Sequence, residues 1–179
     1  RDGVDEGILL ENNMISRFTF NNMVAMALFL KDYKWLTNFI GSAASYLAPK
    51  YREQTISFNK ARLSFAQKDF DNALIHLQSA EYNDLVNILI SKMLLLQVYY
   101  ELDAFDSLES HLDSFQQFIR RREVSDFHRA NFVNIIGFVR KLIQLPVYDK
   151  IKLQELKDQI QAEPILSIKS WLLEKADDL

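Results

Sequence analysis

The 179-residue chain contains no cysteine, only four glycines and only three prolines. Without cysteine, neither a disulfide framework nor a thiolate metal site can form. The absence of cysteine also fits a reducing compartment, and we expect a cytoplasmic protein. Because glycine and proline interrupt helices, their scarcity beside 49% hydrophobic residues predicts an all-α protein with short connections.

A strong net charge is also lacking, since 21 Lys and Arg residues stand against 24 Asp and Glu residues. A chain with this balance has no overall attraction to nucleic acid or to an anionic membrane. The apolar run at residues 85–100 is shorter than the roughly 20 residues that a membrane span needs. Three polar residues interrupt the run: Asn87, Lys92 and Gln97. We therefore expect no membrane association and interpret the run as a central core helix.

Recognisable catalytic motifs are missing as well. The chain has no HExxH, no glycine-rich phosphate loop, no GxSxG elbow and no cysteine nucleophile. We predict that the protein is not an enzyme and that it has no cofactor. His76 and His111 occupy equivalent positions of two similar segments, but a metal site normally needs three or four converging ligands. We therefore expect no metal site and favour exposed positions for both histidines.

What the sequence does contain is an internal repeat. Residues 61–80 (ARLSFAQKDFDNALIHLQSA) align without a gap on residues 96–115 (LQVYYELDAFDSLESHLDSF), with Phe70 on Phe105. Equivalent positions of the two copies are thus 35 residues apart. Tyr33 stands at the corresponding place of a more divergent copy, 37 residues before Phe70. A period of this size in helix-forming sequence is typical of stacked helical-repeat proteins.

The helical spacing of apolar residues predicts antiparallel hairpins and a final helix that covers the end of the array. Four hairpins are expected over residues 18–48, 50–80, 84–121 and 126–162. Pro164 is expected to open the final helix, residues 165–176. No flexible linker separates these parts, so we expect one domain over residues 1–179. Because the chain starts at Arg1, we expect it to be part of a longer chain, and we interpret the apolar patch at residues 8–10 as the tail of a further helix.

The repeated unit resembles the tetratricopeptide repeat, a helix–turn–helix of about 34 residues with small residues where helices pack closely. Ala61, Ala73 and Ala80 match the small positions, and Phe70 matches the aromatic position that packs into the hairpin. In the next copy larger residues stand at the small positions: Leu96, Leu108 and Phe115. These replacements imply wider helix spacing, so we describe the array as TPR-like. Residues 62–68 and 170–175 are also similar to a group of uncharacterised bacterial repeat proteins.

The resemblance implies an α-α superhelix whose concave face binds a peptide or helix of another protein. The family's clamp for chaperone-tail carboxylates is not matched, because Ile90, Met93 and Leu94 stand at clamp positions. The concave face is instead expected to present aromatic residues with a few polar groups. The candidate peptide-binding residues are Asn21, Phe58, Arg62, Phe65, Gln97 and Tyr100, with Phe18 and Phe29 beside them.

Three alternatives accompany this prediction. Aromatic residues at helical spacing are usually core, so the same side chains could pack between neighbouring hairpins. The array could then serve as a structural spacer or as a dimerisation domain. A weaker alternative is nucleic-acid contact through an anion patch at Arg120, Arg121 and Arg122, although positive charge at a helix end also complements the helix dipole. The sequence leaves the identity of the partner and the oligomeric state open.

Overall fold

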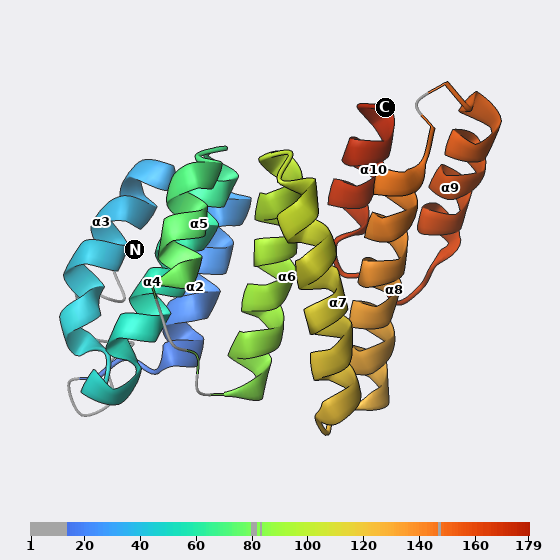
Figure 1. Cartoon of the computed structure of the whole chain (residues 1–179). Coiled ribbons are helices and arrows are strands. Elements are labelled where there is room, and N and C mark those ends of the chain that lie inside the picture. Colours follow the sequence, from blue (N-terminus) through green and yellow to red (C-terminus); the bar gives the residue numbers. More distant parts are fainter. Residues whose placement is uncertain (1–13, 80–81, 83, 147) are drawn as a thin grey trace. The chain divides into compact units, whose positions relative to one another are not determined.

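The computed structural model describes residues 14–79, 82, 84–146 and 148–179 (Figure 1). The described residues form helices and no β-strand, with one isolated bridge between Ile15 and Leu47. The all-α prediction is therefore confirmed. The apolar patch at residues 8–10 lies outside the described residues. The elements are α2 (Arg17–Phe29), α3 (Tyr33–Ala43), η1 (Ala44–Tyr46), α4 (Pro49–Ala66), α5 (Phe70–Gln78), α6 (Leu85–Glu101), α7 (Phe105–Arg121), α8 (Asp126–Gln144), α9 (Lys150–Ala162) and α10 (Lys169–Asp177).

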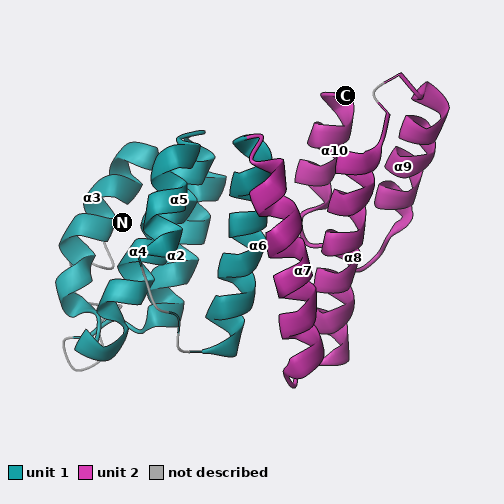
Figure 2. Ribbon diagram, viewed as in Figure 1, with its two compact units in different colours: residues 1–102 teal, residues 103–179 magenta. Residues whose placement is uncertain are grey.

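The chain divides into two compact units, residues 1–102 and residues 103–179 (Figure 2). In the first unit, α4 packs against α2, α3, α5 and α6, and α2 also packs against α3. In the second unit, α7 and α10 both pack against α8, and α9 packs against α10. The division falls inside the predicted 84–121 hairpin, whose two helices belong to different units. The expectation of one domain stays a prediction.

The three aligned aromatic residues each begin a helix: Tyr33 begins α3, Phe70 begins α5 and Phe105 begins α7. Two residues before each of them the backbone takes a positive φ, which is 55° at Lys31, 61° at Lys68 and 52° at Asp103. The residue between has similar dihedral angles in all three places, with φ from −92° to −82° and ψ from 58° to 74°. The repeat seen in the sequence thus corresponds to a turn of recurring backbone conformation.

Local hydrogen bonds explain this turn at the end of α4. The amide of Lys68 donates to the Phe65 carbonyl (3.0 Å), and the amide of Asp69 donates to the Ser64 carbonyl (2.8 Å). This pattern ends a helix with a residue in the left-handed region. The Asp69 side chain then accepts from the Asn72 amide (3.3 Å) and caps the start of α5. The turn is therefore encoded within a few residues of itself.

Glycine at position 68 is expected to stabilise the protein, because a lysine side chain disfavours positive φ and glycine does not. Lys68→Gly should raise the free energy of unfolding by about 0.5–1 kcal/mol, measured by urea denaturation. Gln67→Gly is the matched control, since Gln67 has a negative φ of −87°. That control should lower the free energy by a similar amount. Equal effects of the two substitutions would contradict the turn geometry.

The prediction of a final helix over residues 165–176 is wrong at its start, because α10 begins only at Lys169. Two asparagines of α8 hold the preceding loop in a non-helical path. The Asn131 side chain accepts from the Ser167 amide (2.7 Å) and donates to its hydroxyl (3.1 Å). Asn134 Nδ2 donates to the Ile165 carbonyl (3.2 Å). These backbone groups are used by α8, so Pro164 does not open a helix.

Candidate functional site

Helices α2 and α4 bring together two of the predicted site residues, Asn21 and Arg62, around a buried amide that sequence analysis missed. The amide belongs to Asn59, whose side chain is fully buried. Its Nδ2 donates to Asn21 Oδ1 (2.6 Å) and to the Thr55 carbonyl (2.8 Å), and its Oδ1 accepts from Arg62 Nη1 (3.1 Å). Asn59 precedes Arg62 by three residues, which places both side chains on one face of α4. That spacing is the signal that could have identified Asn59.

The guanidinium of Arg62 lacks a counter-charge in the described part of the chain. Its Nη1 donates to Asn59 Oδ1 and to the Asn21 carbonyl (3.5 Å), and its Cζ lies 5.7 Å from the centroid of the Phe58 ring. No carboxylate of the described residues forms an ion pair with it, and its Nε and Nη2 donate to none of their acceptors. Burial lowers the pKa of Arg62. A partly desolvated cation surrounded by neutral groups is energetically unfavourable, and an acidic ligand would relieve this.

The remaining residues of the predicted binding face differ in accessibility. Phe58 and Gln97 are buried, and Phe58 packs in a core cluster with its ring 6.2 Å from that of Tyr82. Phe65 is half-buried, with its ring 5.5 Å from the ring of Phe70. Asn21, Arg62 and Tyr100 are also half-buried. Phe58 and Gln97 therefore contribute packing in this conformation, and the accessible part of the face consists of the other four side chains.

The three arginines of the candidate anion patch, Arg120, Arg121 and Arg122, are exposed at the end of α7. Arg122 lies over the Phe118 ring, with its Cζ 5.5 Å from the ring centroid. The carbonyls at this helix end are bound by a residue of α8 instead. Arg129 Nη1 donates to the Ile119 carbonyl (2.8 Å), and its Nη2 donates to the Arg122 carbonyl (3.2 Å). Sequence analysis did not identify this role of Arg129, because the two residues meet only after the chain turns.

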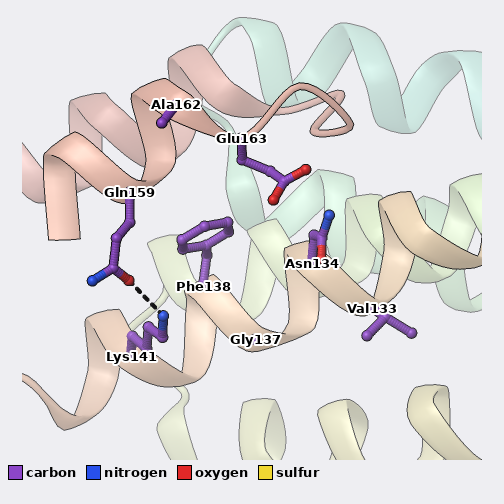
Figure 3. A pocket seen from close by; sticks show the side chains of 8 residues that line it. All are labelled: Val133, Asn134, Gly137, Phe138, Lys141, Gln159, Ala162 and Glu163. Carbon is purple, nitrogen blue, oxygen red and sulfur yellow. Dashed lines mark hydrogen bonds between the residues drawn. The ribbon is translucent and has the colours of Figure 1, made fainter.

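A groove of about 550 Å³ lies between α8 and α9 (Figure 3). Residues of α8 and of the last part of α9 line it, and α9 packs against α10. Lys141 Nζ donates to Gln159 Oε1 across the groove (2.7 Å) and lies 5.2 Å from the centroid of the Phe138 ring. A Cβ atom added at Gly137 would meet nothing within 4 Å, so packing does not require glycine there. The groove has mixed polarity and was not foreseen from the sequence.

The expectation of exposed histidines is wrong for His111, which is buried with its ring 6.0 Å from that of Phe115. His76 is half-buried, and burial and the nearby positive charge of Lys60 lower its pKa, opposed by Asp69. Within the described ranges, no group of three or more His, Cys, Asp or Glu residues could hold a metal ion. Nor is any described helix both long enough and apolar enough to cross a membrane.

Comparison with known proteins identifies no relative, since no family model, no curated protein and no solved structure matches the chain. The residues and their contacts are therefore the basis for a functional assignment.

Proposed function

We propose that this protein is a TPR-like helical array that binds an acidic peptide or helix of a partner protein. The ligand would lie along the face formed by α2, α4 and α6, which in a TPR-like array is the concave face. The recurring turn before α3, α5 and α7 supports the repeat architecture. On this proposal the protein acts by binding rather than by catalysis, and it needs no cofactor.

The observation that carries the proposal is the missing counter-charge of Arg62. A guanidinium with free Nε and Nη2 donors offers the planar geometry that a carboxylate binds best. On this proposal the half-buried rings of Phe65 and Tyr100 lie on the same face and supply apolar contact area beside the charge. A suitable ligand therefore combines an Asp or Glu side chain with neighbouring apolar residues.

Selection of random peptides displayed on phage against the immobilised full chain tests this proposal. We expect enriched peptides to carry Asp or Glu next to apolar residues. Arg62→Met should weaken binding of an enriched peptide by about 10- to 100-fold, because a charge-assisted hydrogen bond contributes roughly 1.5–3 kcal/mol. Isothermal titration calorimetry at low salt gives the two affinities.

Lys60→Met is the matched control, since it removes an exposed positive charge from the same helix, two residues before Arg62. Two residues along a helix point to different sides, so the control should bind as the unchanged protein does. Enriched peptides without acidic residues, or equal losses in the two variants, would contradict the proposal. So would the absence of any enrichment.

Nucleic-acid binding through Arg120, Arg121 and Arg122 has less support. The three side chains are exposed, but the whole chain carries a net charge of −3 and the patch has few charges to neutralise phosphates. A structural spacer is the other simple role for the array, and that role would not explain why the charge of Arg62 has no counter-charge among the described residues.

A further inference from the structure

One side of α2 is apolar and uncovered among the described residues. Four large side chains form it, with exposed fractions of 68% for Phe18, 66% for Met26, 86% for Phe29 and 69% for Leu30. Asn22 and Ala25 are exposed between them. The spacing of these residues places them along one side of the helix, away from the core residues Phe20, Val24 and Ala27. We call this surface, Phe18, Asn22, Ala25, Met26, Phe29 and Leu30, the α2 stripe.

The α2 stripe also lacks charge. Residues 18–30 contain no Asp, Glu, Lys or Arg. A helix side that faces water normally carries charged residues, and monomeric proteins rarely expose an apolar patch of more than a few hundred Å². The single charge of α2, on Arg17, is bound to Asp84 at 2.7 Å. The α2 stripe therefore has the composition of an interface that is buried against another apolar surface.

We infer that the α2 stripe is a self-association surface on which α2 of a second copy packs antiparallel. A two-fold symmetric contact places the same residues against each other, so any net charge on the surface would repel itself. The α2 stripe has no such charge. In an antiparallel pair centred near Val24, Phe18 of one copy lies opposite Leu30 of the other. This pair brings the apolar ends of the two stripes together. Nearer the centre, Asn22 of one copy lies opposite Met26 of the other.

The exposed area of the α2 stripe sets the expected strength of this contact. Large apolar side chains bury about 150–250 Å² each, so the stripe offers roughly 600 Å² per copy at its observed exposure. Two copies would bury about 1,200 Å², which is the lower end of the range for specific interfaces. The dimer should therefore be reversible, with a dissociation constant of micromolar order. Asn21 borders the α2 stripe, three residues after Phe18 and four before Ala25, whereas Arg62 belongs to α4, so the contact neighbours the proposed peptide site without using Arg62.

Sedimentation velocity of the full chain between about 1 and 200 µM tests this inference. We expect the weight-average sedimentation coefficient to rise from the monomer value towards the dimer value across this range. The double variant Met26→Glu and Phe29→Glu should raise the dissociation constant at least 100-fold, because it puts carboxylates into an apolar contact that offers them no positive partner. Both positions are exposed, and an unchanged circular dichroism spectrum would show that the variant folds.

Ile75→Glu is the matched control, since Ile75 is an exposed apolar residue of α5 in the same unit. It should leave the dissociation constant unchanged. A chain that stays monomeric at every concentration, or a dimer that the double variant does not weaken, would overturn the inference. Peroxide oxidation of the monomer adds a second readout, with Met14 as reference. Met26 is the more exposed, so slower oxidation of Met26 would show that another part of the chain covers the stripe, and would also overturn the inference.

Discussion

Replacing Asn59 with alanine is expected to lower the free energy of unfolding by about 3 kcal/mol, because buried polar groups lose their partners. Arg62 would lose its side-chain acceptor and Asn21 Oδ1 would lose its donor, whereas the Thr55 carbonyl would keep only its helical bond from the backbone N–H of residue 59. Since Asn59 is fully buried, water cannot replace these bonds without opening the contact between α2 and α4. Urea denaturation followed by circular dichroism measures the change.

Asn22→Ala is the control for Asn59→Ala, because Asn22 is an exposed asparagine of α2. That substitution should change the free energy of unfolding by no more than about 0.5 kcal/mol. If Asn59→Ala costs less than about 1 kcal/mol, the hydrogen-bond network around Asn59 is not formed as described, since each unsatisfied buried group alone accounts for that amount. The orientation of Arg62, and with it the proposed ligand chemistry, would then need revision.

The second large effect is expected for Phe20→Ala, which should lower the free energy of unfolding by about 3–5 kcal/mol through loss of buried area and a remaining cavity. The Phe20 ring is fully buried, with its centroid 4.8 Å from that of Phe39, and Phe39 stacks in turn on Trp35 at 4.9 Å. A loss of this size is a large fraction of the 5–15 kcal/mol that stabilises a typical domain. Phe29→Ala on the same helix is the control, because the Phe29 side chain is mostly exposed.

Hydrogen exchange resolved along the chain makes Phe20→Ala a test of the two compact units as well. Phe20 belongs to the first unit, so we expect protection to fall mainly in residues 14–102 and to persist in residues 103–179. A simultaneous loss of protection throughout the described chain would show that the two units unfold together, as one domain does. Equal effects of Phe20→Ala and Phe29→Ala on the free energy of unfolding would contradict the described core.

Part of the candidate site could be predicted from the sequence and part could not. Helical spacing together with the resemblance to the tetratricopeptide repeat predicted Asn21 and Arg62 on one face, and the structure brings the two residues together. The same spacing did not distinguish Phe58, which is buried, from Phe65, which is half-buried. The difference arises because the Tyr82 ring, 24 residues further along the chain, packs against Phe58. Periodicity describes which residues share a side of a helix, and it does not describe what covers that side.

The sequence by itself determined the helical class of the described residues and the places where α3, α5 and α7 begin. These features depend on helix propensity, capping and turn geometry, which act between residues only a few positions apart. Only the tertiary structure decided that Asn59 joins Asn21 to Arg62, that Arg129 binds the carbonyls at the end of α7, and that α8 holds the loop before α10 out of a helical path. Each of these depends on polar groups from separate segments meeting in space. Hydrogen bonds of this kind leave no periodic trace in the sequence, because any of several donors or acceptors could have met in their place.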